Sequence, residues 1–358
     1  MEHRSLALVA AVAILCATPA LAQDSKAWLE KENLEAADTK TFGDYEVVVA
    51  RVKGAKDAKE AEERVVIFNK GKVAFQTSAK ETDPGSKWTI QSVGRDLAGN
   101  GQPDVHISSF SGGANCCTTH QVIQLKPQVK RIAVYSAGSM GAGDFVEIPG
   151  RKQPVMVSAD DSSANAFAPY ANSYFPLLIL EVGPKGRLQF AKDMMQSRLP
   201  GMPPPVCAQP LATANPWLKE RCAEYTSTRR QARTREIKER LANLKASRSA
   251  DKLTWEDYFQ NGVLAAVSAE INRYTYTGHR AAGMNWLETV WPGNDAVKVK
   301  FVQTLGLTQS KSVFAEDIRA IVFPRMSPTI LPRTVTLSPA TIPLTLPRLL
   351  TTTSGPVT

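Results

Sequence analysis

The chain has 358 residues, a formal net charge of +9 and 43% hydrophobic residues. This length allows two domains. Beyond the N-terminal segment, no apolar run reaches the roughly 18 residues that a membrane span needs, which excludes a transmembrane protein and predicts a soluble mature chain.

Residues 1–22 predict a cleaved secretory signal peptide. A basic start precedes an apolar core at residues 6–15, and Ala20-Leu21-Ala22 supplies the small residues of a cleavage site. Cys16 follows a leucine, whereas a lipid-attachment site wants a small residue there, so we interpret Cys16 as an ordinary part of the signal peptide. We therefore expect the mature protein in the periplasm or secreted from the cell.

Four cysteines remain in the mature chain: Cys116, Cys117, Cys207 and Cys222. In an oxidising compartment we expect disulfides rather than free thiols. Cys207 and Cys222 are close in sequence and form the favoured pair, which leaves the adjacent Cys116 and Cys117. Neighbouring strand residues point to opposite faces, so a bond between those two requires a distorted turn.

Residues 23–197 are predicted to form an all-β domain. A short helix at residues 27–37 precedes many short segments rich in β-branched residues, with turn residues such as Gly71 between them. The expected strands are residues 45–52, 65–68, 73–76, 88–93, 105–108, 121–125, 131–135, 155–158, 177–182 and 187–190. This pattern favours a propeller-like or sandwich architecture.

One internal similarity supports a repeated unit. Residues 97–107 align with residues 148–158 at an offset of 51, which places Gly99 opposite Gly150 and Gln102-Pro103 opposite Gln153-Pro154. A period near 50 residues is typical of propeller blades. The second copy does not repeat the acidic positions, because Val155 stands opposite Asp104.

Residues 198–206 form a proline-rich linker, and residues 207–318 are predicted to be a helical domain. Ile237, Leu241 and Leu244 have the spacing of an amphipathic helix. Further helices are expected at residues 257–276, 281–291, 295–305 and 310–318, with Tyr274, Tyr276, Trp286 and Trp291 in their core. The predicted fold class is α+β, with the all-β domain before the helical domain.

Residues 319–358 contain no acidic residue and many prolines among Thr, Leu and Ser, so we expect a disordered tail. The abrupt change of composition is also consistent with an out-of-frame end of the gene, and both interpretations remain open.

The positive charge is concentrated in residues 219–248, where ten Lys or Arg against four Glu give a local excess of +6. Such a helix is able to bind an anionic partner, but a solvated helix face is the simpler interpretation. No aromatic residues alternate with the basic ones as single-strand binding requires, so we expect no nucleic-acid partner.

Residues 96–104 have the spacing of a calcium loop. Asp96, Asn100 and Asp104 place side-chain oxygens at positions 1, 5 and 9, and Gln102 offers its carbonyl at position 7. Ala98 supplies no ligand at position 3. Calcium binding and a turn whose Asp and Asn side chains bond only to their own backbone are therefore both open.

The same stretch resembles the acidic turn of FG-GAP repeats, the integrin-type propeller blades of many exported bacterial proteins. In that family the turn precedes an inner strand and can hold calcium, which implies Asp96, Asn100 and Asp104 as ligands here. Residues 111–117 (Ser-Gly-Gly-Ala-Asn-Cys-Cys) are similar to uncharacterised members of this group.

Two other chemistries are possible within residues 106–120. His106, His120 and the adjacent cysteines suggest a zinc cluster, but adjacent cysteines seldom reach one tetrahedral metal. A Cys116/His120 nucleophilic pair requires a free thiol. The sequence contains no Gly-x-Ser-x-Gly, His-Glu-x-x-His or phosphate-binding glycine loop.

These observations favour an exported, non-catalytic binding or structural protein of the cell envelope whose partner is an envelope protein or polymer. The alternative is an envelope hydrolase that uses an acid near Asp96 and Asp104 or the Cys116/His120 pair. The adjacent acids Asp160 and Asp161 are predicted to belong to a solvated turn.

Overall fold

The computed structural model describes residues 19–54, 62–77, 86–113, 116–138, 143–249, 252–293 and 295–323. Most of the predicted signal peptide, and the predicted tail from residue 324 onwards, lie outside these ranges. The described residues belong to one structural unit, Met1–Pro324.

Twelve strands of the described chain form three antiparallel sheets of four, and consecutive strands are neighbours within each sheet, so the predicted all-β region is confirmed. The first sheet contains β1 (Leu34–Phe42), β2 (Tyr45–Val52), β3 (Glu63–Asn69) and β4 (Lys72–Gln76). The second contains β5 (Lys87–Arg95), β6 (Asp104–Gly113), β7 (Cys116–Gln124) and β8 (Lys130–Gly138). The third contains β9 (Asp144–Val146), β10 (Val155–Ala159), β11 (Leu177–Val182) and β12 (Leu188–Phe190).

The central strands of the first sheet are buried on both faces. Val47 and Val49 of β2 contribute to the core shared with the second sheet, whereas Val48 packs in the core beneath helix α1 (Pro19–Lys31). All three valines are at most 1% exposed. Alternate strand side chains point to opposite faces, so a continuous valine run suits a strand that is covered on both sides.

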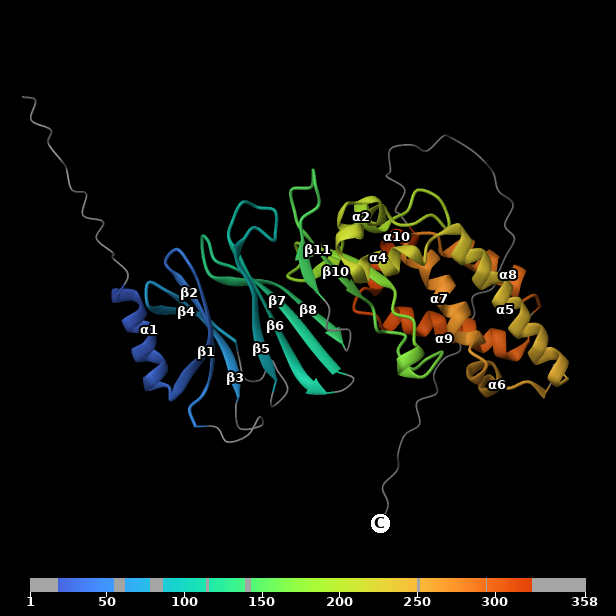
Figure 1. Cartoon of the computed structure of the whole chain (residues 1–358), viewed down its shortest axis with the longest axis horizontal. Coiled ribbons are helices and arrows are strands. Elements are labelled where there is room, and N and C mark those ends of the chain that lie inside the picture. Colours follow the sequence, from blue (N-terminus) through green and yellow to red (C-terminus); the bar gives the residue numbers. More distant parts are fainter. Residues whose placement is uncertain are drawn as a thin grey trace, which may run out of the picture. The chain divides into compact units, whose positions relative to one another are not determined.

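The three sheets pack face to face in chain order (Figure 1). One core, with Ile67 and Ile107, joins the first and second sheets, and another, with Val122 and Leu178, joins the second and third. Leu29 of α1 packs on the other side of the first sheet. The third sheet shares its core with the C-terminal helices, so both ends of the stack are covered by helices.

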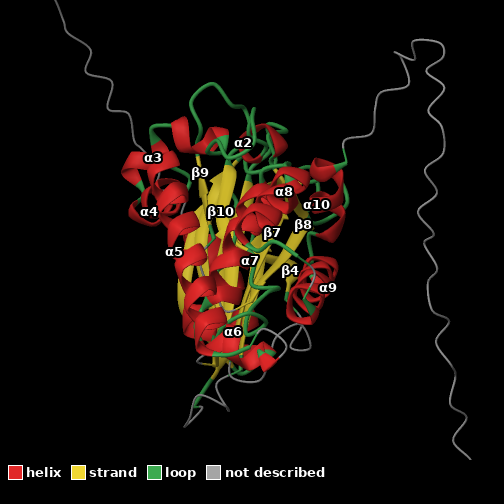
Figure 2. Ribbon diagram, turned by 90° about the vertical axis from the view of Figure 1, so that its right-hand side faces the viewer, coloured by secondary structure: helices red, strands yellow, loops and turns green. Residues whose placement is uncertain are grey.

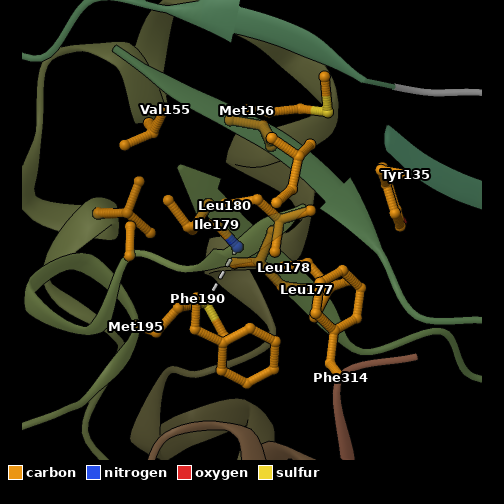
Figure 3. Close-up of a cluster of buried hydrophobic side chains, with 14 of the residues drawn as sticks. Tyr135, Val155, Met156, Leu177, Leu178, Ile179, Leu180, Phe190, Met195 and Phe314 are labelled. Atoms are coloured by element: carbon orange, nitrogen blue, oxygen red, sulfur yellow. Dashed lines mark hydrogen bonds between the residues drawn. The ribbon is translucent and has the colours of Figure 1, made fainter. Parts of the chain in front are cut away.

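Aromatic and aliphatic side chains form the contact between the third sheet and the helices. Figure 3 shows Leu178 and Ile179 of β11 beside Phe190 of β12 and Phe314. The ring centroids of Phe190 and Phe314 are 5.3 Å apart, and the Ile179 amide donates to Met195 Sδ at 3.1 Å. The sheets and the helical region therefore share one continuous core.

The helical region is confirmed, and Figure 2 shows its helices in front of the strands. Ile237, Leu241 and Leu244 are buried as their spacing predicts. The helices after β10 are η2 (Tyr170–Asn172), α2 (Lys192–Met195), η3 (Pro205–Ala208), α3 (Leu211–Ala214), α4 (Pro216–Ala223), α5 (Ser227–Ser247), α6 (Trp255–Gln260), α7 (Val263–Tyr276), α8 (Arg280–Val290), α9 (Ala296–Lys311) and α10 (Ala315–Val322). No helix among the described residues has both the length and the apolar character that a membrane crossing requires.

Several element boundaries differ from the sequence-based prediction. The first helix ends at Lys31 rather than residue 37, because Asn33 adopts a φ of 56° and Leu34 begins a strand paired with β2. Gly262, with a φ of 68°, divides the predicted helix 257–276 into α6 and α7. The last helix runs to Val322, beyond the expected limit at residue 318, because Ile321 is buried in the core.

The two similar sequence segments occupy equivalent loops. Gly99 lies between the first and second strands of the second sheet, and Gly150 lies between the first and second strands of the third. The loops also touch, because a Cβ on Gly99 would lie 2.8 Å from Cβ of Gln153. The two segments therefore fall at the same position in two successive sheets.

Asp160, directly after β10, joins the third sheet to two parts of the helical region. Its Oδ2 accepts hydrogen bonds from the Tyr276 hydroxyl at 2.5 Å and the Ser312 hydroxyl at 2.6 Å, and its Oδ1 accepts the Ser162 amide at 2.9 Å. Asp160 is 4% exposed, so the prediction of a solvated turn is wrong for this residue. The cause is tertiary, because both hydroxyl donors are more than 100 residues away in sequence.

We expect Asp160→Ala to lower the free energy of unfolding by about 3 kcal/mol or more, because it leaves two buried hydroxyls without their charged acceptor. Asp38→Ala, at an exposed position of β1, is the matched control and should change stability by less than about 0.5 kcal/mol. Chemical denaturation measures both. Equal effects of the two substitutions would contradict the structural role of Asp160.

Candidate functional site

Residues 96–103 join β5 to β6 and, together with Asp104 at the start of β6, are here called the acidic turn. Asp96 accepts the backbone N–H of Asn100 on Oδ1 at 3.0 Å and that of Gly101 on Oδ2 at 2.7 Å. Asn100 Oδ1 accepts the N–H of Gln102 at 2.9 Å. The acidic turn is therefore folded by side-chain bonds to its own backbone.

Asp104, the first residue of β6, has an orphaned carboxylate oxygen. Its Oδ2 accepts the N–H groups of Leu97 at 2.8 Å and Ala98 at 3.1 Å, but its buried Oδ1 has no hydrogen-bond partner. Burial raises the pKa of Asp104 to about 6, and the nearby charge of Asp96 adds to the increase. An orphaned buried carboxylate is stabilised either by a proton or by a cation.

The acidic turn holds all four residues that the sequence predicts as calcium ligands: Asp96, Asn100, Gln102 and Asp104. The orphaned Oδ1 of Asp104 beside Asp96 is the feature that fits a cation. Within the described part of the chain, no group of three or more His, Cys, Asp or Glu side chains is placed to hold a metal. A calcium ion here would therefore depend on two carboxylates supplemented by amide and backbone oxygens.

His106 and His120 form a buried pair on the face of the second sheet that meets the third. His106 Nε2 lies 3.0 Å from His120 Nδ1, and the two residues are 1% and 2% exposed. His106 also packs edge-on against Phe145 of β9, with ring centroids 5.2 Å apart. One imidazole must donate to the other, so the pair fixes which nitrogen of each ring carries a proton.

The second ring nitrogen of His120, Nε2, does not face His106; it is buried and has no hydrogen-bond partner. Burial lowers the pKa of His106 to about 3, with repulsion from His120 as a second cause, and burial lowers the pKa of His120 to about 4. Both imidazoles are therefore neutral at pH 7. His120 Nε2 presents either an N–H donor or a free lone pair, depending on the direction of the bond to His106.

His120 contributes to the lining of a pocket of about 280 Å³ between the second sheet, the third sheet and α4. Gln91 of β5 and Asp144 of β9 supply polar groups, and Asn215 and Trp217 come from the start of α4. Gln91 Nε2 donates to Ser108 Oγ at 2.8 Å, which orients its side chain. This combination of one aromatic face and several polar groups is typical of a site for a small polar ligand.

The wall of the pocket formed by α4 is held by a disulfide. Cys207 of η3 bonds to Cys222 of α4, as the sequence predicts, and the bridge closes a loop that contains Asn215 and Trp217. Asn215 caps the helix by accepting the Leu218 amide at 3.0 Å. The disulfide restrains the unfolded chain and fixes the helix that carries Trp217.

Cys117 is also disulfide-bonded, so it offers neither a free nucleophile nor a zinc thiolate. Its backbone N–H donates to Ser111 Oγ at 2.6 Å, which stabilises the turn between β6 and β7. The side chain of Cys116 lies outside the described residues. The Cys116 half of the predicted Cys116/His120 pair therefore lies outside the described residues, while His120 itself contacts His106.

The sequence identified the acidic turn and both histidines but not the rest of the pocket. Gln91 comes from β5, Asp144 from β9, and Asn215 and Trp217 from the start of α4, and these three elements share no motif or spacing. The fold brings them together through sheet stacking and the disulfide, and neither of these produces a local sequence signal.

Comparison with known proteins finds no significant match to this chain among family models, curated proteins or solved structures. The resemblance to FG-GAP repeats therefore stays a prediction that depends on the acidic turn and on residues 111–117 of the sequence.

We expect the protein to lose stability as the pH falls from about 6.5 towards 4. The folded state holds His120 neutral with a pKa of about 4, whereas its usual value of 6.5 applies after unfolding. As the pH falls, His120 of the unfolded chain takes up a proton that the folded state does not. The free energy of unfolding therefore decreases by up to about 3 kcal/mol from His120 alone. Chemical denaturation at several pH values measures the slope of the free energy of unfolding against pH.

His120→Gln should make this slope shallower, and His279→Gln is the matched control because His279 is the partly exposed residue before α8. The slopes, rather than the absolute stabilities, are compared, so a general loss of packing does not affect the result. The same pH dependence in wild type and His120→Gln would contradict a neutral, buried His120.

Proposed function

We propose that this chain is an exported, non-catalytic binding protein of the cell envelope. Its ligand is a small polar group of an envelope polymer or protein, bound in the pocket between the second sheet, the third sheet and α4. The observation that carries the proposal is the buried, unpartnered His120 Nε2 in a pocket that also contains Trp217 and three polar side chains. A ligand hydroxyl or amide would supply the missing hydrogen bond.

The arrangement of strands supports an FG-GAP-like origin for the β region. Three successive four-stranded meanders pack face to face, as propeller blades do, and the acidic turn joins the first two strands of the second meander. Unlike a closed ring of blades, this stack is covered at its ends by α1 and by the C-terminal helices. We propose that it is a short, capped array of blade-like units.

Soluble peptidoglycan fragments are the probe for the proposed binding function. We expect saturable binding that changes the fluorescence of Trp217, because this residue lines the pocket. Gln91→Ala and Trp217→Ala should weaken binding at least about tenfold, since each removes a direct contact worth roughly 1.4 kcal/mol or more. Calorimetric titration measures the affinities.

Gln231→Ala, at an exposed position of α5, is the matched control for Gln91→Ala and should leave the affinity unchanged. No binding to the wild type, or equal affinity in wild type and pocket variants, would rule out this ligand class at this site.

An envelope hydrolase is the second candidate, favoured by the neutral imidazole of His120. If His106 accepts the hydrogen bond, the unprotonated Nε2 of His120 is able to remove a proton from water. Turnover of the same fragments, detected as new reducing ends or amino groups and lost in His120→Gln, would support this candidate over simple binding.

We further propose that the acidic turn binds calcium weakly through Asp104 and Asp96, with Asn100 and the Gln102 carbonyl. Without calcium, the raised pKa of Asp104 means that the folded state holds this proton more tightly than the unfolded chain. The resulting contribution to the free energy of unfolding is fully present below about pH 4 and is lost as the pH rises through about 6. Asp104→Asn lacks this ionisation and should therefore gain up to about 3 kcal/mol relative to wild type between pH 4 and pH 7. Urea denaturation in EDTA measures the difference.

Millimolar calcium at pH 7 should raise the melting temperature of the wild type but not that of Asp104→Asn, because a ligand that binds only the native state stabilises it. Asp38→Asn is the control and should respond like the wild type. An unchanged wild-type melting temperature would show that the acidic turn bonds only to its own backbone.

A further inference from the structure

A second pocket, of about 320 Å³, lies in the helical region, where α8 begins beside α9 and α10. It is separate in sequence and in lining residues from the His120 pocket. Small and apolar residues form much of its wall, including Ala315, Ile318 and Val322 of α10. Phe323, which also lines it, is 71% exposed, so the pocket has an apolar rim that faces solvent.

Arg280 provides a charge without an acidic partner in this apolar setting. The residue is partly buried, and its guanidinium donates to Oε1 of Gln309. Gln309 Nε2 donates to Asn272 Oδ1 at 2.9 Å, which fixes the amide so that its oxygen faces Arg280. Among the described residues, no carboxylate pairs with this guanidinium, which carries five N–H donors.

Two arginines of the helical region, the buried Arg273 and the partly buried Arg233, differ from Arg280 because both have carboxylate partners. Arg273 bonds to Glu270 at 3.1 Å and Glu224 at 3.0 Å, and Arg233 contacts the same two acids. Burial lowers the pKa of Arg280, whereas Tyr174 and the acids around Arg273 raise the pKa of that residue despite its burial. A buried charge is normally compensated, so the guanidinium of Arg280 lacks a partner that the fold supplies elsewhere.

The surroundings of the pocket do not provide that missing acid. Arg319 of α10 is a second cation in the lining, and none of the described lining residues is acidic. The two acids of α10 are engaged by the third sheet, since Asp317 bonds to Arg187 at 2.6 Å and Glu316 lies 3.7 Å from the same residue. Arg280 is also the first residue of α8, where the helix dipole favours an anion.

We propose that this pocket binds a small organic anion with an apolar body, such as a medium-chain carboxylate. The carboxylate forms a charge-assisted, bidentate contact with Arg280, and the apolar body lies along Ile318, Val322 and Phe323. The volume is at the lower end of the range for small-molecule sites, which favours a ligand of modest size.

Octanoate tests this proposal on the full-length chain, with octanol and acetate as matched probes that lack the charge or the apolar body. We expect octanoate to bind with a Kd between about 10 µM and 1 mM, as its few non-hydrogen atoms allow. Octanol and acetate should each bind at least about tenfold more weakly. Calorimetry and thermal shift measure the affinities.

Arg280→Gln should reduce octanoate affinity at least about tenfold, Arg319→Gln less, and Arg280→Lys should retain part of it because the charge is kept. Arg235→Gln, at an exposed site of α5, is the control. Unchanged melting of Arg280→Gln in the absence of ligand separates lost binding from lost folding. Equal binding of octanol, full affinity in Arg280→Gln, or no binding of octanoate to the wild type would overturn the proposal.

Discussion

The carboxylate of Asp160 is the contact on which the junction between sheets and helices depends. It lies at the end of β10 and accepts hydrogen bonds from Tyr276, the last residue of α7, and from Ser312, between α9 and α10. A buried carboxylate is costly unless its oxygens are bonded, so the three elements cannot shift independently without losing these bonds. The apolar core beside it, with Phe190 and Phe314, supplies a larger but non-directional attraction. The hydrogen bonds of Asp160 therefore fix the relative position of the sheet and the helices, and the surrounding apolar core supplies most of the attraction between them.

The stack of sheets explains why helices stand at both of its ends. Strands β2 and β10 are apolar on both faces, and a sheet of this kind is stable only when both faces are covered. The second sheet is covered by its two neighbours, but the first and third each have one face without a neighbouring sheet. Leu29 and Trp28 of α1 pack on the first, and the helices that carry Leu218 and Ile318 pack on the third. Removal of either cover would expose a large apolar surface.

The sequence was sufficient to predict the order of β and helical regions, because strand periodicity and helix spacing are local. It was not sufficient to predict what covers each strand. The alternation of Val105 and Ile107 with His106 and Ser108 is typical of a strand with one solvated face. Both polar residues are nevertheless buried, and His106 packs against Phe145 of the third sheet. The same limit applies to Asp160, since its hydroxyl partners are 116 and 152 residues away. Candidate sites were recognisable where their residues are consecutive, as in the acidic turn, and unrecognisable where stacking assembles them.

Both proposed binding pockets depend on the same central core. Val157 lines the His120 pocket and Ile318 lines the Arg280 pocket, and both side chains belong to the apolar core between the third sheet and the helices. A ligand in either pocket therefore contacts a residue whose packing holds the helical region on the sheets. Since a ligand that binds only the folded state stabilises it, occupancy of either pocket would strengthen this junction, and loosening of the junction would weaken both sites. The disulfide on α4 limits such loosening on the His120 side, where it fixes the helix that carries Trp217. On the Arg280 side the corresponding restraint is the ion pair between Asp317 of α10 and Arg187, which ties the pocket wall to the edge of the third sheet.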